Sequence, residues 1–381
     1  MKIFLITGEA SGDLIGSKLV HELNKTFKNN ILKGVGGEKL RELGLKPIFK
    51  QADIEVNGFI EIIPHIPRIL SRINQTVEEI IKFKPDLIIT IDSPDFNFRV
   101  IKKLRKKAPD LNCKIAHYVA PTVWAYRSKR AEKVAKLYDL LLVILPFEPP
   151  LFEKHGLKTV FIGHPIFTKF KPISKLNKSN KIIITPGSRK SEIQRFAPII
   201  QKLIYLINSN FGTKFKLYFF VTNETKDLIH NIYIDEISSS QIKTIYKQDD
   251  KDKIISDCFL AIVKSGTNTM QIANESIPMI IFYKFNFLTY HLLKKVFKVK
   301  TKFANLLNFH AKHEIIPEYL HSKCDADLIY QEFRNYYYHS DKRSQQVEAY
   351  SKIISSFKNH DKIAPEQKAA VELAKILEST N

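Results

Sequence analysis

The sequence predicts an α/β protein built from two open parallel sheets in tandem. Short apolar runs that end in Gly, Ser, Asp or Pro recur ahead of helical patterns, which is typical of parallel strands buried on both faces. The runs form two series separated by a polar, basic segment. The chain has 381 residues, 44% of them apolar, so it has room for two domains of about 150 residues and an appendage.

The expected strands set the domain boundaries. The first series comprises residues 3–6, 87–91, 115–119, 140–145 and 161–162, and the second comprises residues 182–185, 215–221, 259–263 and 279–282. Residues 167–181 (FTKFKPISKLNKSNK) have the composition of a linker. We therefore predict a domain over 1–166, a linker over 167–181, a second domain over 182–340 and C-terminal helices over 341–381. The last helix starts near Pro365.

Charge, cysteine content and hydropathy narrow the class of protein. The net charge of +21 attracts nucleic acid, anionic lipid or phosphorylated small molecules. An A+T-rich genome would also produce the abundance of Lys, Ile and Asn, so the charge is weaker evidence of function. The three scattered cysteines indicate neither a disulfide framework nor a zinc site. The N-terminal apolar run breaks too early for a signal peptide, and no apolar stretch approaches the ~18 residues of a membrane span. These features favour a cytoplasmic protein with at most peripheral membrane contact.

Ligands of open α/β sheets bind where strands end, so the residues after each expected strand are site candidates. Residues 8–13 (GEASGD) follow the first strand, where glycines permit close backbone approach and Ser11 and Asp13 can cap the next helix. Residues 91–97 (IDSPDFN) place Asp92 at a strand tip, where it is either a general base or a turn-forming residue.

Two further segments of the first half are weaker signals. Residues 117–130 hold the only Trp of the chain, Trp124, with Arg127 and Arg130, which can form a wall for a sugar or a phosphate; a lone Trp is more often a core residue. Residues 34–37 (GVGG) resemble part of a dinucleotide fingerprint, but Lys39 stands in place of its third glycine, so no NAD site is predicted.

The second half carries two potential anion sites. Residues 185–189 (TPGSR) and 265–267 (SGT) each follow a strand and open a helix, where backbone N–H groups, Ser188 and Arg189 can hold a diphosphate. Together they indicate a nucleotide donor rather than a nucleic-acid surface. Neither segment has Walker spacing and no metal-ligand pattern stands at a strand end, so ATP hydrolysis is disfavoured and no metal is predicted.

In their order along the chain, these segments resemble the lipid A disaccharide synthase family. The resemblance rests on GEASGD (8–13), IDSPDFN (91–97), HYVAPTVWAYRSKR (117–130), LPFE (145–148), GHP (163–165), PGSR (186–189), SGT (265–267) and NLL (305–307). Each motif is weak alone, but eight in one order over nearly the whole chain are specific.

The resemblance implies a GT-B glycosyltransferase, in which two Rossmann-like domains face a cleft and the C-terminal helices pack back on the N-terminal domain. Such enzymes join UDP-2,3-diacylglucosamine to the 6-hydroxyl of 2,3-diacylglucosamine 1-phosphate (lipid X), forming β-1′,6-linked lipid A disaccharide 1-phosphate and UDP. The resemblance implies a Gram-negative host and no metal or redox cofactor. It leaves open whether the protein is a monomer or a homodimer.

The family's functional residues carry over onto matching positions. Asp92 is implied as the catalytic base, or alternatively as an anchor for sugar hydroxyls. The remaining implied residues are Glu9, Ser11, Asp13, Trp124 and Arg127 for the acceptor, Ser188, Arg189, Ser265, Gly266, Thr267 and Gln271 for UDP, and Asn305 as a further active-site residue. The sequence departs from the family where Gln271 replaces a usual Glu that accepts ribose hydroxyls in related enzymes; Gln can still accept through its carbonyl oxygen.

Acylated substrates imply contact with an anionic inner-membrane surface, for which two segments are candidates. Residues 62–70 combine Ile66, Ile69 and Leu70 with nearby arginines, and residues 284–303 interleave aromatic residues with lysines. The second segment reads equally well as a helix buried on one face. We expect the first to hold the acyl chains.

Two alternative functions stay open at this point. One is another nucleotide-sugar enzyme of the same fold, such as a UDP-GlcNAc epimerase or the glycosyltransferase of the peptidoglycan lipid precursor. The other is a basic nucleic-acid-binding protein, which the absence of a zinc finger, RRM or KH signature disfavours.

Overall fold

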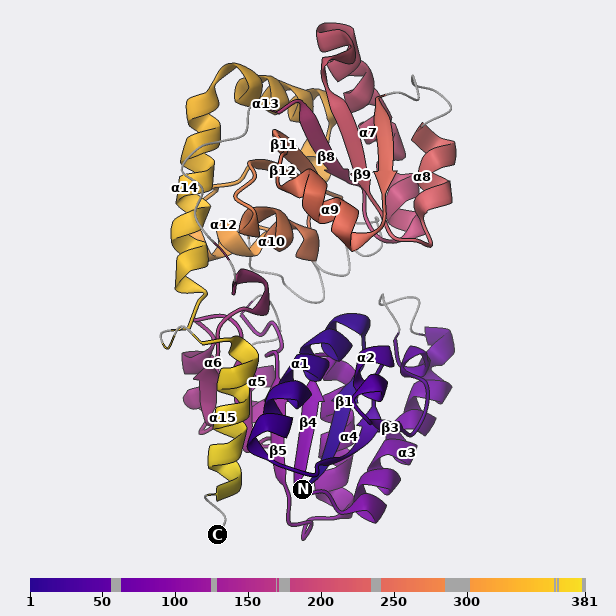
Figure 1. The fold of residues 1–381 in the computed structure, drawn as a ribbon, viewed down its shortest axis with the longest axis vertical. Helices are drawn as coiled ribbons and strands as arrows, with labels where there is room; N and C mark the ends of the chain where they lie inside the picture. The colour runs from indigo at the N-terminus through magenta and orange to yellow at the C-terminus, as the bar shows by residue number, and fades with distance from the viewer. Residues whose placement is uncertain are drawn as a thin grey trace. The chain divides into compact units, whose positions relative to one another are not determined.

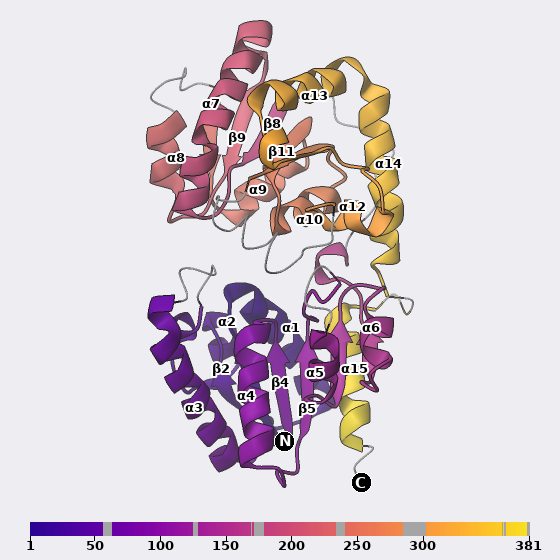
Figure 2. The same cartoon turned by 180° about the vertical axis from the view of Figure 1, so that it is seen from behind.

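The computed structural model describes residues 1–55, 63–124, 129–168, 170, 179–233, 241–284, 302–359, 361 and 363–378, which divide into two compact units. Among these residues, unit 1 comprises 1–168 and 357–378, and unit 2 comprises 170–356. Figures 1 and 2 show their elements from opposite sides. Each unit has an α/β fold built on one parallel sheet, as the sequence predicts.

The described part of unit 1 contains a seven-stranded parallel sheet in the order β3-β2-β1-β4-β5-β6-β7. Its strands are β1 (Lys2–Thr7), β2 (Ile31–Val35), β3 (Lys46–Pro47), β4 (Leu87–Ile91), β5 (Lys114–Tyr118), β6 (Leu140–Val143) and β7 (Thr159–Phe161). Its helices are α1 (Ala10–Thr26), α2 (Glu38–Glu42), α3 (Ile66–Phe83), α4 (Pro94–Lys107), α5 (Arg130–Ala135), α6 (Pro149–Glu153) and α15 (Pro365–Glu378). Helices α1 and α15 cover one face of the sheet and α3 and α4 the other (Figures 1 and 2).

The described part of unit 2 contains a six-stranded parallel sheet in the order β10-β9-β8-β11-β12-β13. Its strands are β8 (Lys181–Thr185), β9 (Lys216–Phe220), β10 (Ile242–Ile245), β11 (Leu260–Lys264), β12 (Met279–Tyr283) and β13 (Glu318–Leu320). Its helices are α7 (Lys190–Phe211), α8 (Lys226–Tyr233), α9 (Gln248–Ile255), α10 (Thr267–Asn274), α12 (Leu306–Ala311), α13 (Ala326–Tyr338) and α14 (Ser340–Ser356). Short 3₁₀ turns cover residues 51–53, 63–65, 165–167, 212–214 and 321–323.

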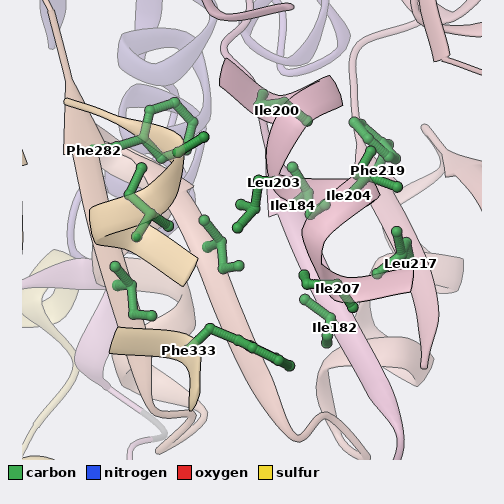
Figure 3. Packing of buried hydrophobic residues seen from close by; sticks show 14 of the residues in the cluster. Ile182, Ile184, Ile200, Leu203, Ile204, Ile207, Leu217, Phe219, Phe282 and Phe333 are labelled. Carbon is green, nitrogen blue, oxygen red and sulfur yellow. The ribbon is translucent and has the colours of Figure 1, made fainter. Parts of the chain in front are cut away.

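The core of unit 2 shows how apolar spacing selects the elements. Helix α7 buries Ile200, Leu203 and Ile207, which recur every three or four residues and therefore lie on one face. That face packs on alternate residues of β8 and β9, with Phe333 of α13 beside them (Figure 3). Burial of these aliphatic faces holds the sheet rigid beneath the loops at its carboxyl edge.

The two C-terminal helices belong to different units, which corrects the prediction that residues 341–381 return together to the N-terminal domain. Gln346 of α14 accepts the N–H of Met279 at 2.7 Å and donates to its carbonyl at 2.9 Å, so α14 is bonded to β12 of unit 2. Only α15 packs on unit 1, where Leu373 and Ile376 join the core beside Leu23 of α1 (Figure 1).

Candidate functional site

The sheet of unit 1 has its topological switch point between β1 and β4. The chain adds β2 and β3 on one side of β1 and then returns to place β4 on the other, so the loops 8–13 and 92–97 leave neighbouring strands at the same edge. The two loops are in close contact at Gly8: a Cβ added there would lie only 2.1 Å from the Ser93 Oγ. The structure therefore brings together two segments that the sequence singled out separately.

Asp92 stands at the tip of β4 in a strained turn. Asp92 and Ser93 both have left-handed backbones, with φ of 50° and 42°, a conformation that costs about 1–3 kcal/mol per non-glycine residue and persists mainly at functional sites. The Asp92 N–H donates to the Tyr118 carbonyl at 2.9 Å, and Asn97 Nδ2 donates to the Asp92 carbonyl at 2.7 Å. These two bonds hold the backbone of the turn in place.

The environment of the Asp92 carboxyl makes it harder to ionise than an exposed aspartate. Burial raises the pKa of Asp92 above its usual range, and the hydrogen bond from the Ser93 N–H partly opposes the rise. A half-buried carboxyl with a raised pKa is a stronger base once ionised than an exposed aspartate. The geometry is therefore that of a candidate general base on a rigid support.

Asp13 is buried, and its carboxylate is bonded to the backbone. Its oxygens accept the N–H groups of Gly37 at 2.7 Å, Lys39 at 3.0 Å and Leu40 at 3.4 Å, so Asp13 caps α2 instead of its own helix. The N-cap of α1 is Glu9, while Ser11 is exposed in its first turn. A role of Asp13 in acceptor binding stays a prediction; its bonds give it a structural role.

The GVGG segment serves packing. Gly34 has φ of 145° and a Cβ there would lie 1.9 Å from the Leu5 carbonyl oxygen, whereas one at Gly37 would lie 2.6 Å from the Asp13 carboxylate. Gln51, which sequence reasoning missed, donates to the carbonyl of Glu9 at 3.0 Å and to Thr7 Oγ1 at 2.8 Å. Without a motif around it, Gln51 gave no signal in the sequence.

A pocket of about 300 Å³ lies beside the Asp92 turn. Its apolar wall comes from α3 and Ile54, and its polar rim comes from Glu9, which precedes α1, and from the start of α4. The lining residues are Glu9, Ile54, Ile66, Ile69, Leu70, Ser93, Pro94, Asp95, Phe96 and Arg99. Ile66 and Leu70 are 42% and 47% exposed, which is high for aliphatic side chains. Ile66, Ile69 and Leu70, the residues predicted to hold acyl chains, thus line a pocket that adjoins the candidate base.

The aromatic wall predicted from residues 117–130 is described in part. Trp124 is partly buried, with its ring edge-on to Phe147 at 5.7 Å, and Arg130 pairs with Asp95 at 2.8 Å. Arg127 lies outside the described residues. Trp124 is therefore placed in unit 1 by packing with Phe147, and its contact with the acceptor stays a prediction.

Unit 2 has its own switch point between β8 and β11. Residues 186–189 leave β8 and residues 265–267 leave β11, and the two strands are neighbours in the sheet. The Lys264 N–H donates to Thr185 Oγ1 at 3.2 Å, which joins the two strand ends. Both predicted anion segments therefore lie at the edge where α/β sheets bind ligands.

The donors in these turns are not all available to a ligand. Ser188 N–H donates to Glu192 Oε2 at 3.3 Å, and Ser265 Oγ donates to the Ala304 carbonyl at 3.1 Å. Arg189 and Gln271 are exposed, and Gly266 opens α10 with φ of 156°. Thr267 is the first residue of α10, where its backbone N–H points out of the helix start.

Charged residues that the sequence did not reveal surround these turns. Lys264 Nζ pairs with Glu192 Oε1 at 2.9 Å and lies 5.2 Å from the centre of the Tyr283 ring. Burial raises the pKa of Tyr283, Glu192 adds to the rise, and Arg195 and Arg189 oppose it, so all three charges lie within electrostatic range of that phenol. In the sequence these residues are single charges far apart from one another, so no motif indicated that they lie together.

Asn305 holds the SGT turn through its side chain. Its Oδ1 accepts the N–H of Leu307 at 2.8 Å and caps α12, while Nδ2 donates to Thr269 Oγ1 at 2.9 Å. Thr269 Oγ1 in turn donates to the Gly266 carbonyl at 2.7 Å. Asn305 is 3% exposed, so the structure gives it a positioning role that the sequence could not supply.

Three comparisons place this architecture among known proteins. A family model described as lipid-A-disaccharide synthetase matches residues 3–372. A lipid-A-disaccharide synthase of Rickettsia bellii (strain OSU 85-389) is 37% identical over 374 residues, covering 96% of each chain, and one of Rickettsia prowazekii (strain Madrid E) is 38% identical over 363 residues, covering 93% of each. This chain belongs to the lipid-A-disaccharide synthetase family.

Solved structures confirm the fold expected of this lipid-A-disaccharide synthetase family member. The S. aureus MnaA–UDP co-structure aligns with a TM-score of 0.63 at 16% identity, covering 99% of this chain and 97% of that chain. A glycosyltransferase of kitacinnamycin aligns with a TM-score of 0.62 at 9% identity, covering 98% of each chain. The fold is GT-B, and the protein is a glycosyltransferase of lipid A biosynthesis.

Metal clusters and membrane spans are both absent from the part of the chain that the structure describes. There, no group of three or more His, Cys, Asp or Glu side chains is arranged to hold a metal ion, and no helix combines the length and hydropathy of a membrane span. The basic segment 285–301 lies outside these residues, so its predicted membrane contact is not described.

The family motif LPFE contains a buried carboxyl, Glu148, with a 1% exposed fraction. The N–H groups of Leu145 and Ile144 and the Trp124 indole favour its charged form, but burial outweighs them and raises its pKa to about 8. The folded protein thus keeps this proton at a pH where the unfolded chain, with a pKa near 4.5, has lost it.

A proton held only by the folded state makes stability fall as pH rises from about 4.5 to about 8. Each pKa unit corresponds to about 1.4 kcal/mol, so Glu148 should cost wild type a few kcal/mol of stability across this window. Glu148→Gln cannot titrate and should lose less stability between pH 5 and pH 8.5 in urea denaturation. Glu153→Gln, at an exposed position of α6, is the control, and equal pH slopes for wild type and Glu148→Gln would contradict the assignment.

Proposed function

We propose that this family member transfers the 2,3-diacylglucosaminyl group of UDP-2,3-diacylglucosamine to the 6-hydroxyl of 2,3-diacylglucosamine 1-phosphate. The products are the β-1′,6-linked lipid A disaccharide 1-phosphate and UDP. The proposal rests on family membership and on one structural observation, the strained Asp92 turn at the switch point of unit 1. The names of the Rickettsia relatives support the same reaction.

In this reaction Asp92 accepts the proton of the acceptor 6-hydroxyl. The freed oxygen bonds to the anomeric carbon, the bond from that carbon to the UDP oxygen breaks, and its electron pair leaves with UDP. Attack opposite the leaving group inverts the anomeric centre. The raised pKa of Asp92 supports its role as the base, and Glu9, Ser11, Trp124 and Arg127 are proposed to bind the acceptor.

The leaving UDP gains negative charge on its β-phosphate. We assign its binding to the switch point of unit 2, where Arg189 and the N–H groups at the start of α10 can stabilise that charge. The Ser188 hydroxyl is proposed to donate to the diphosphate, and the Ser265 hydroxyl to do so in place of its bond to the Ala304 carbonyl. The exposed Gln271 on α10 is proposed to bind the ribose through its amide. The UDP in the S. aureus MnaA co-structure, which shares this fold, supports a uridine nucleotide as the ligand.

The acyl chains are proposed to occupy the pocket of unit 1 and to draw the protein to the cytoplasmic face of the inner membrane. Apolar side chains at the start of α3 beside the exposed Arg68 suit an anionic lipid surface, whereas Arg72 already pairs with Asp53 at 2.7 Å.

Substituting Ile66 and Ile69 together with Ser should lower binding to phosphatidylglycerol-containing vesicles about tenfold, because the exposed Ile66 and the partly buried Ile69 lose their apolar contact with lipid. Vesicle sedimentation measures the effect. Ile31→Ser, which removes a 49% exposed aliphatic side chain elsewhere in unit 1, is the control. Unchanged binding by the Ile66/Ile69 variant would exclude this segment as the contact.

A thin-layer assay tests the reaction. Purified protein, radiolabelled 2,3-diacylglucosamine 1-phosphate and UDP-2,3-diacylglucosamine in detergent, without added metal, should yield a new lipid of disaccharide mass and equimolar UDP. Product formation should persist in EDTA. Folded protein that gives no product, or that turns over UDP-GlcNAc without a lipid acceptor, would contradict the proposal.

A further inference from the structure

Glu192 and Lys264 form an ion pair beneath the two anion turns of unit 2. Glu192 belongs to the first turn of α7, and Lys264 ends β11 directly before residues 265–267. Their side chains are only 7% and 18% exposed, so the pair is largely shielded from water. Neither residue has a place in the proposed binding of UDP given above.

The carboxylate of Glu192 supports the turn over residues 186–189 directly. One oxygen accepts the Ser188 N–H, and the other accepts from Lys264 Nζ. Gly187 has φ of 120°, and a Cβ there would lie 2.7 Å from Glu192 Oε2, so the turn rests against the carboxylate without an intervening side chain. The backbone bond from Lys264 to Thr185 fixes the other end of the same strand-to-turn junction.

This arrangement creates an electrostatic conflict with a diphosphate. A buried carboxylate directly below an anion-binding turn repels the phosphates, and the repulsion is strong where water is excluded. Lys264 is the cation in contact with that carboxylate. We propose that Lys264 is a positioning residue, an inference that rests on the proposed UDP site. Lys264 neutralises Glu192, so that the carboxylate can hold the turn over residues 186–189 in shape while that turn binds a diphosphate.

The test measures UDP binding by calorimetry, which is independent of the transfer reaction. Lys264→Met leaves Glu192 charged and unpaired, and should weaken UDP binding at least tenfold. The double variant Glu192→Gln/Lys264→Met removes the charge but keeps an oxygen for the Ser188 N–H, and should return to within about threefold of wild type. Lys181→Met, which breaks the pair with Asp257 at the opposite end of the β8 strand, is the matched control.

The outcomes separate this inference from the proposed function. A double variant as weak as Lys264→Met would show that Lys264 contacts the diphosphate itself, which overturns the positioning role; so would wild-type affinity in Lys264→Met. If Lys264→Met does not fold, the double variant alone decides, and a tenfold loss there overturns the inference. Wild-type protein that does not bind UDP would contradict the proposed donor as well.

Discussion

Asp92→Asn should lower kcat about 10³-fold, within the range that a positioned general base contributes. Asn is nearly isosteric with Asp and also tolerates a left-handed backbone, so the turn at φ of 50° should keep its shape. The amide cannot accept the acceptor proton, whereas it can still bond sugar hydroxyls. KM for lipid X should therefore change little.

The pH profile sharpens this test. Because burial raises the pKa of Asp92, the rate of the wild type should climb with pH up to a value above the usual range of an aspartate and then level off. The rate of Asp92→Asn should not show this rise with pH. Asp110→Asn, past the far end of α4, is the control. A variant that keeps activity within a few-fold, or one that raises KM alone, would make Asp92 a substrate anchor.

Gly8→Ala should have the second largest effect, through the same turn. The new methyl would lie 2.1 Å from Ser93 Oγ and 2.5 Å from its Cβ, so the 92–97 loop must move. Overpacking of this kind costs about 1–3 kcal/mol, and displacing a catalytic group by about 1 Å costs about 10²-fold in rate. Steady-state kinetics and the denaturation midpoint measure the two losses.

A compensating substitution distinguishes displacement of Asp92 from general damage. Ser93→Gly removes both atoms that the new methyl would meet, and glycine adopts φ of 42° freely. The double variant Gly8→Ala/Ser93→Gly should recover most of the kcat lost in Gly8→Ala. Gly44→Ala, which is strained by a φ of 91° but meets no atom within 4 Å, shows the effect of a glycine replacement that does not press on the 92–97 loop. Failure of the double variant to recover would mean that the two loops are not coupled in this way.

The fold was largely predictable because its central strands are buried on both faces. Runs such as residues 87–91 and 182–185 are continuous and apolar, so their ends, and hence the loops at the switch points, could be located from the sequence. The short edge strands β3 and β13, of two and three residues, carry no such pattern. Val119 was expected to extend β5, but its φ of 73° takes it out of the strand.

The candidate site was predictable only where a residue follows a strand directly. Asp92 does so, but Asp13 caps a helix 24 residues further on, and Lys264 meets Glu192 across 72 positions of sequence. Such pairs exist only once the sheets are assembled. The same limit applies to α14, because Gln346 bonds to the backbone of Met279, which lies 67 positions earlier in the sequence.

The placement of α15 has a consequence for biosynthesis. Unit 1 is completed by residues that follow unit 2 in the sequence, with Asn359 Nδ2 bonded to the carbonyl of Ile162, 197 positions earlier. During translation the whole of unit 2 leaves the ribosome before Leu373 and Ile376 can cover the α1 side of the first sheet. A chain that lacks α15, whether nascent or truncated, therefore carries an uncovered apolar face, and the synthesis of α15 is the step that protects unit 1 from aggregation.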